Sequence, residues 1–102
     1  MLVLVICKDA DDAARRREAT MNEHLLHADD IAPSLRLAGR LVDEEGRGTV
    51  GSFLLVDVAD AAEARRLVQD DPYSRAGVWR DVAYHPVELA GHNGFDIREG
   101  GA

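Results

Sequence analysis

The first hydrophobic segment of the chain is continuous. All residues from Met1 to Cys7 are apolar, and Val3, Val5 and Ile6 among them are β-branched. An unbroken run of this kind is typical of a strand that is covered on both faces of its sheet. We therefore predict a buried central strand over Met1–Cys7.

A helix is expected next. Asp9–Asp12 is a polar segment that can cap a helix, and Ala13–Glu18 contains good helix formers. Apolar residues then recur with 4-3-4-3 spacing, which predicts one buried stripe of an amphipathic helix, formed by Met21, Leu25, Ala28, Ala32 and Leu35. Pro33 interrupts this pattern and predicts a kink or split near residues 29–30. Gly39 is the expected C-terminal cap.

The remaining pattern predicts three more strands and a second helix. A short strand is expected at Arg40–Asp43, and a strongly apolar strand at Val50–Val58 follows a turn with two glycines. Asp60 begins the second helix, with Glu63 three residues later, close to a capping box. The last strand alternates between apolar and polar residues over Val78–Pro86.

The order of these elements is β-α-β-β-α-β, which predicts the fold. This order is typical of the ferredoxin-like arrangement in the α+β class, a four-stranded antiparallel sheet with both helices on one face. Residues 1–88 form the single expected domain. Residues 89–102 are a Gly-rich polar tail, in which His92 and Phe95 are the notable side chains.

The face of the sheet opposite the helices needs a cover of its own. The first strand has no polar face, and the strand at Val50–Val58 places Phe53 and Leu55 on one side but Leu54 and Val56 on the other. A sheet that is apolar on both faces, with helices on only one, predicts a homodimer through the helix-free face.

Composition then narrows the functional classes. The 102 residues carry 12 basic and 19 acidic side chains, a net charge of −7, which argues against nucleic acid and against an anionic membrane surface as partners. The first apolar run is far shorter than the roughly 20 residues of a membrane span, and no positive region precedes it as in a secretory signal. The lone cysteine, Cys7, cannot form an internal disulfide, so a cytoplasmic location is expected.

His24 and the Asp70–Asp71–Pro72 step are the main candidates for chemistry. His24 is adjacent to Leu25, at the edge of the predicted stripe, where a helix residue can face a cleft. Asp71 followed by Pro72 is also a standard helix start, which explains the aspartate without any function. The two interpretations are compatible, because a capping carboxylate has a second oxygen that can orient a histidine.

Other groups admit simpler interpretations. The run Arg15–Arg17 is typical of a solvated helix face, although one arginine could turn inward and bind an anion through its planar fork. His24 and His27, with Asp29 and Asp30 nearby, could hold a metal, but their spacing is loose. Cys7 lies in the predicted buried strand and favours a core position over a nucleophilic one.

Several motifs in order resemble the YCII-related (YciI-like) family of the dimeric α+β barrel superfamily. The resemblance rests on the apolar first strand, the spacing of Arg17 and His24, and the Gly39-Arg40-Leu41 segment taken as a helix exit. It continues with Gly51-Ser52, and its most specific part is Asp70-Asp71-Pro72-Tyr73 followed by Ala76-Gly77-Val78-Trp79. The final Tyr84-His85-Pro86 resembles the family's closing strand. Where the family has a Gly-Pro step after its second strand, this chain has the acidic stretch at 42–46.

The resemblance implies a homodimer with an active site in which His24 meets Asp71. It further implies that Arg17, Ser52 and Tyr73 bind the substrate, with no cofactor and no metal. One similar group removes chloride from chlorinated hydroxyquinols, and the superfamily includes isomerases and cofactor-independent oxygenases of small aromatic rings. We expect general acid/base chemistry on a small cyclic or aromatic molecule. The alternative is a non-catalytic module that binds a small ligand or acts by dimerising.

Overall fold

A four-stranded antiparallel sheet is the framework of the structure, a computed structural model that describes residues 1–91. The strand order is β2-β3-β1-β4, so the first strand is central. The bounds are β1 Leu2–Asp9, β2 Leu35–Val42, β3 Thr49–Asp57 and β4 Trp79–Val87. The predicted tail residues His92 and Phe95 lie outside the described residues.

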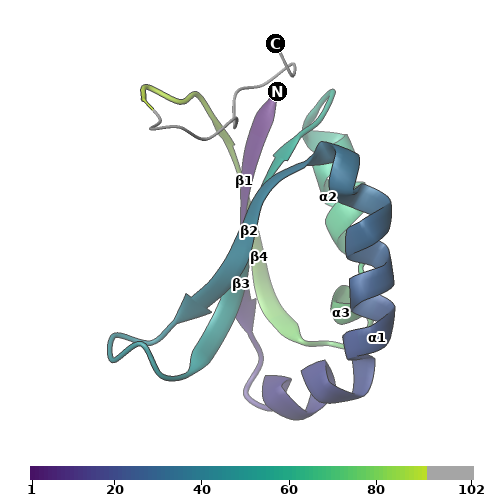
Figure 1. Cartoon of the computed structure of the whole chain (residues 1–102), viewed down its shortest axis with the longest axis vertical. Coiled ribbons are helices and arrows are strands. Elements are labelled where there is room, and N and C mark those ends of the chain that lie inside the picture. The colour runs from purple at the N-terminus through teal and green to yellow at the C-terminus, as the bar shows by residue number, and fades with distance from the viewer. Residues whose placement is uncertain (92–102) are drawn as a thin grey trace.

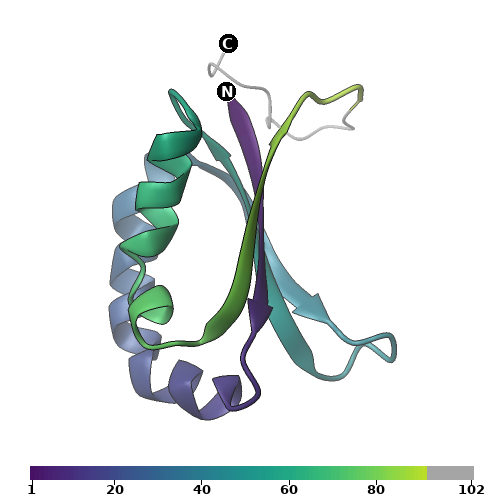
Figure 2. The ribbon, with the colours of Figure 1, turned by 180° about the vertical axis from the view of Figure 1, so that it is seen from behind.

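The helices lie on one side of this sheet (Figures 1 and 2). They are α1 Ala13–Ile31, the 3₁₀ turn η1 Ala32–Ser34, α2 Ala61–Gln69 and the short α3 Pro72–Arg75. Element order and strand order together are those of the ferredoxin-like α+β arrangement, and the predicted fold class is confirmed.

The hydrophobic core lies between the helices and one face of the sheet. Val3, Val5 and Cys7 of β1 are fully buried there. Cross-strand partners share a face, so Leu54 and Val56 of β3, which pair with Val5 and Val3, belong to the same layer. Each such side chain contributes about 1.5–3 kcal/mol on burial. This layer fixes the sheet against which the helices pack.

The opposite, helix-free face of the sheet is also apolar. Leu4 pairs with Leu55, Ile6 pairs with Phe53, and Gly39 of β2 lies on the other side of Phe53. Gly39 has no side chain, and a Cβ there would overlap the Phe53 ring. The aromatic ring therefore covers the glycine, and the face stays apolar across three strands.

Two predicted helix starts are confirmed by their caps. Asp60 accepts a hydrogen bond from the Glu63 amide at 2.8 Å, and the Glu63 carboxylate reaches back to the Ala59 amide at 2.7 Å. Asp71 accepts from the Tyr73 amide at 2.9 Å, with Pro72 as the first residue of α3. Pro72–Arg75 thus forms a single helical turn. Asp12, in contrast, precedes α1 without a side-chain cap and pairs with Arg16 at 2.8 Å.

The end of the first helix differs from the prediction. The helix is continuous to Ile31, the η1 turn contains Pro33, and the chain is already extended at Leu35. Gly39 therefore lies in the middle of β2 instead of capping a helix, and the segment Gly39-Arg40-Leu41 is strand. Proline cannot continue an α-helix, so the 4-3-4-3 pattern across it was accidental.

The inward face of α1 also differs from the prediction. Met21 and Leu25, from the expected buried stripe, are 43% and 53% exposed. The residues that are buried or half-buried are Ala13, Arg17, Thr20, His24, His27, Ala28 and Ile31. Helical spacing is retained, but the face toward the sheet is largely polar. This face places His24 and Arg17 inside the molecule.

Candidate active site

His24 and Asp71 are in direct contact although 47 residues separate them. His24 Nδ1 lies 2.9 Å from one carboxylate oxygen of Asp71 and 3.0 Å from the other. The His24 side chain is 25% exposed, whereas that of Asp71 is 4% exposed. A carboxylate accepts hydrogen bonds, so the contact places the proton on Nδ1 and leaves Nε2 unprotonated in the neutral ring. Within residues 1–91, no group forms a hydrogen bond with Nε2 of His24.

The position of Asp71 is set by the local structure of α3. Its extended backbone conformation and the following proline make it the N-cap, and the same oxygen that contacts His24 accepts from the Tyr73 amide. The cap holds the carboxylate rigidly at the end of the short helix. Asp71 therefore acts as the helix cap and as the partner of His24 in the same conformation.

Tyr73 supports the imidazole from behind. Its ring stacks on His24, with centroids 3.8 Å apart and planes within 1° of parallel, and it forms a T-shaped pair with Trp79, with centroids 5.8 Å apart. Burial raises the pKa of Tyr73, an effect opposed by the Arg17 guanidinium. Tyr73 is 1% exposed and lies behind His24, outside the pocket wall. Its position suits holding His24 better than contacting a substrate.

Arg17 is the arginine of the run Arg15–Arg17 that turns inward. Its Nη2 and Nε contact the two carboxylate oxygens of Asp9 at 2.8 and 3.2 Å, and Nη2 also donates to the Ser52 hydroxyl at 2.9 Å. Its guanidinium lies 5.2 Å from the Tyr73 ring centroid. Arg15 is 83% exposed, as expected for a solvated face. Asp9 thus balances the charge of Arg17, and Ser52 is left free to donate its own hydrogen.

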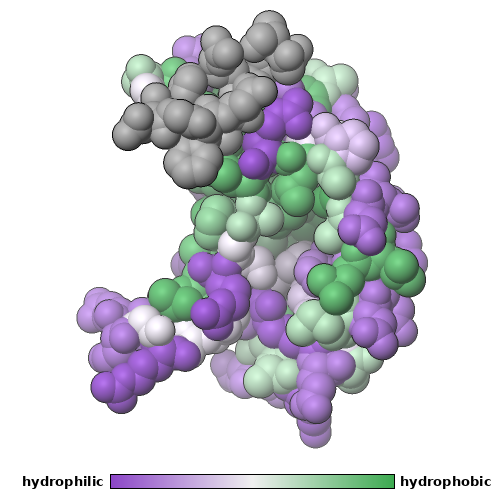
Figure 3. All heavy atoms as spheres, viewed as in Figure 1, coloured by the Kyte–Doolittle hydropathy of each residue, from purple (hydrophilic) through white to green (hydrophobic). Residues whose placement is uncertain are grey.

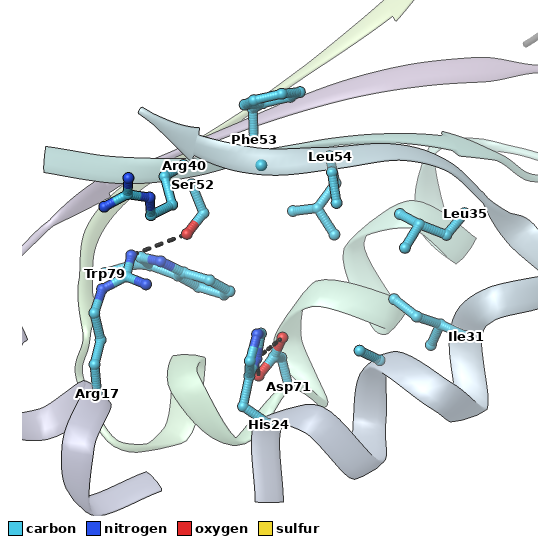
Figure 4. A pocket seen from close by; sticks show the side chains of 13 residues that line it. Arg17, His24, Ile31, Leu35, Arg40, Ser52, Phe53, Leu54, Asp71 and Trp79 are labelled. Atoms are coloured by element: carbon cyan, nitrogen blue, oxygen red, sulfur yellow. Dashed lines mark hydrogen bonds and ion pairs between the residues drawn. The ribbon is translucent and has the colours of Figure 1, made fainter. Parts of the chain in front are cut away.

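Arg17, His24, Ser52 and Asp71 line a pocket of about 260 Å³ between α1 and the sheet. Figure 3 shows the surface hollowed there. In Figure 4, Arg17, Arg40 and Ser52 gather at one end, Ile31, Leu35 and Leu54 at the other, and His24 lies between them on the helix side. Small-molecule pockets start at about 300 Å³ for drug-sized ligands, so this one suits a smaller molecule.

Arg40 of β2 lines the pocket, although the sequence pattern predicts only a short strand there and gives this residue no role. Arg40 pairs with Ser52 in the β2–β3 register, which places it beside a predicted site residue. The sequence contains a signal for the longer strand that carries Arg40. Leu35, Leu37 and Leu41 follow period-2 spacing, which predicts a strand that begins before Gly39.

The histidine pair does not converge as the metal alternative required. His27 Nε2 contacts the Leu67 carbonyl at 2.7 Å, whereas His24 contacts Asp71. Asp29 and Asp30 are exposed. Residues 1–91 contain no group of three or more His, Cys, Asp or Glu side chains that could hold a metal ion. Burial raises the pKa of the Cys7 thiol to about 12, as expected for a core thiol.

Comparison with known proteins decides the family. The model of the YCII-related domain matches residues 1–88. The chain belongs to the YCII-related family. This confirms the resemblance inferred from its motifs. No curated protein sequence matches this member of the family at a significant level.

One solved structure with a similar fold is the 5-chloro-2-hydroxyhydroquinone dehydrochlorinase from Burkholderia phenoliruptrix, in complex with 2,5-dihydroxybenzoquinone. The TM-score is 0.78 at 22% sequence identity, and the match covers 86% of this chain and 94% of the dehydrochlorinase chain. At this identity the likeness shows a shared fold. Among the described residues of this chain, no helix has the length and apolar character needed to span a membrane.

Proposed function

We propose that this YCII-related protein is a cofactor-independent enzyme that moves protons on a small ring bearing hydroxyl groups. The observation that carries the proposal is the Asp71–His24 pair on the wall of a small, partly apolar pocket. The carboxylate fixes the imidazole tautomer, and Nε2 becomes a base for the bound molecule. The dehydrochlorinase of similar fold supports this substrate class.

The proposed reaction is loss of HCl from a chlorinated hydroxyhydroquinone. His24 takes a proton from a ring hydroxyl and returns it to the ring carbon that bears chlorine, which gives the keto tautomer. His24 then takes a second hydroxyl proton, the C–Cl bond breaks, and chloride leaves with the bonding electron pair. The products are a hydroxyquinone, chloride and a proton, so the reaction requires no external oxidant.

The other predicted site residues have supporting roles in this proposal. The Ser52 hydroxyl accepts from Arg17, so its hydrogen can be donated to a substrate oxygen. Arg17 positions Ser52 and contacts the ring substituents at that end of the pocket. Tyr73 is a positioning residue for His24 because the two rings are stacked.

We further propose that the protein acts as a cytoplasmic homodimer joined through the helix-free sheet face. Register places Leu4, Ile6, Leu37, Phe53 and Leu55 on that side of the sheet, and all of them except the buried Leu55 are partly or well exposed to solvent. Leu37 is 39% exposed in the single chain. A continuous apolar surface of this kind gains free energy when a second copy covers it.

Chloride release tests the proposed reaction. The purified protein is incubated without oxygen with 5-chloro-2-hydroxyhydroquinone, and chloride is measured over time. The H24Q variant removes the base while keeping a side chain of similar size, and we expect a loss of about 10²–10⁴-fold in turnover. H27Q is the matched control, since His27 lies on the same helix outside the pocket and glutamine can still donate to the Leu67 carbonyl.

Equal turnover by H24Q and the wild type would contradict the role of His24. A second readout addresses the binding-module alternative. Exchange of ring hydrogens of hydroxyhydroquinone in heavy water, followed by nuclear magnetic resonance, detects proton transfer even when no leaving group is present. A protein that binds these rings yet neither exchanges their hydrogens nor releases chloride is a non-catalytic binder.

A further inference from the structure

Arg17, the arginine expected to bind an anion, already has a carboxylate partner in this structure. Arg17 forms two contacts with Asp9, whose side chain is 9% exposed, and gives a third hydrogen bond to Ser52. A paired guanidinium contributes little net field to a ligand, because the neighbouring carboxylate cancels much of it. A second cationic group is needed if the substrate is an anion.

Arg40 supplies that second group. It lies on β2 directly opposite Ser52, lines the pocket, and remains exposed to solvent. Its Nη1 donates to the Thr49 hydroxyl at 2.9 Å, which fixes the guanidinium, and no carboxylate forms an ion pair with it within residues 1–91. Figure 4 shows Arg40 beside Ser52 at the end of the pocket where Arg17 also reaches.

The rest of the pocket suits a flat ring attached to the charged oxygen. Trp79 is 8% exposed and presents its indole to the cavity, and Leu54 and Ile31 are buried on the side away from Arg40. A dry cavity of about 150 Å³ holds benzene, and the volume here is about 260 Å³. The space therefore accommodates one ring with a few oxygen substituents.

We propose that Arg40 determines specificity for ring substrates with an ionised oxygen, a phenolate or an enolate, which it binds together with the Ser52 hydroxyl. This inference rests on the proposed function, because it concerns the same pocket. Guanidinium binds an oxyanion through short charge-assisted hydrogen bonds, and these are stronger than bonds between neutral groups. An anion held at this end spans the pocket toward His24, which lies on the opposite wall.

The test ligand is 2,5-dihydroxybenzoquinone, whose hydroxyls are conjugated with carbonyls and are therefore ionised at neutral pH. Trp79 is the one tryptophan of the chain, so quenching of its fluorescence by the quinone reports binding in the pocket. We expect R40Q to raise the dissociation constant about tenfold to a hundredfold. R47Q, in the same β2–β3 hairpin, removes the same charge outside the pocket and leaves the constant unchanged.

The neutral analogue 2,5-dimethoxybenzoquinone separates charge from shape. If Arg40 acts through its charge, R40Q and the wild type bind this analogue equally. Equal binding of the dianion by both proteins overturns the inference and leaves the His24 proposal in place. Loss of both ligands in R40Q also overturns it, because the residue then acts on pocket shape. Failure of the wild type to bind either ring overturns the inference together with the proposed substrate class.

Discussion

Asp71 shows how one side chain can serve both the fold and the site. One of its oxygens accepts from the Tyr73 amide and so begins α3, and both oxygens lie within 3.0 Å of His24 Nδ1. The aspartate is 3% exposed, so water competes little for its hydrogen bonds to the Tyr73 amide and to His24. Substitutions at this residue can therefore separate the capping role from the orienting role.

The D71N variant is predicted to keep stability and lose activity. Asparagine caps helices about as well as aspartate, so the free energy of unfolding should change by less than about 1 kcal/mol. Its amide nitrogen can donate to Nδ1 and so favours the tautomer with the proton on Nε2, which lowers turnover by about 10²–10⁴-fold. Urea unfolding and chloride release measure the two effects. A stable variant with wild-type turnover would show that the tautomer of His24 does not matter.

Cys7 gives a second prediction at this scale, for alkaline pH. Burial, with a smaller contribution from the Asp71 charge, raises the pKa of this thiol from 9.0 to about 12. The unfolded chain releases the proton near pH 9, whereas the folded chain retains it. The contribution of the protonated Cys7 thiol to the free energy of unfolding is therefore complete below pH 9 and is lost as the pH rises toward 12. Burial also raises the pKa of Tyr73 and of Tyr84, which act in the same direction.

The free energy of unfolding should accordingly fall above about pH 9, by up to about 1.4 kcal/mol per pH unit from Cys7. The C7A variant should be less stable at neutral pH, because it leaves a cavity, but should lose stability less steeply with pH. Urea unfolding at several pH values measures both slopes. Parallel curves for C7A and the wild type would contradict the assignment to Cys7.

At the scale of elements, α1 and β2 explain most of the differences from the sequence analysis. The inner face of α1 contains Arg17, His24 and His27, because these polar side chains find partners in Asp9, Asp71 and the Leu67 carbonyl. Hydrophobic periodicity assumes that the buried face is apolar, so it selected a stripe that includes the exposed Met21 and Leu25. A helix that forms one wall of a polar site violates that assumption.

Close strand packing predicts unequal effects for two glycine substitutions. A Cβ at Gly51 would overlap the backbone carbonyl oxygen of Cys7, whereas a Cβ at Gly39 would meet the Phe53 ring, which is half-buried and can turn. We expect G51A to lower the free energy of unfolding by about 3 kcal/mol and G39A by about 1 kcal/mol. Thermal and urea unfolding compare the two variants. The reverse order would mean that β1 and β3 can separate more easily than the ring can rotate.

At the scale of the whole molecule, one face of the sheet is used for the site and the other is left apolar. The pocket lies between α1 and the inner face, near β2 and β3. Figures 1 and 2 show that no described helix covers the opposite face. The proposed dimer would cover this face with a second copy of the chain.

The proposed dimer predicts that a charge on the helix-free face will separate the protomers. L37E places a carboxylate beside Leu55 on that face, and Leu37 is already 39% exposed in the single chain, so folding should survive. L26E is the control on the outer surface of α1, where Leu26 is 66% exposed. We expect L37E to weaken dimerisation more than tenfold, because a buried unpaired carboxylate is costly. Light scattering after size exclusion gives the masses, and a monomeric wild type would refute the interface.

The sequence by itself determined the order of the four strands and two longer helices, the central first strand, both side-chain caps and the family. These depend on local signals, such as the run Met1–Cys7 and the pairs Asp60 with Glu63 and Asp71 with Pro72, and each acts over a few residues. The tertiary structure alone decided which face of α1 turns inward, which arginine is paired and that Arg40 lines the pocket. Those outcomes depend on partners brought from distant parts of the chain, and no local pattern records where such partners will lie.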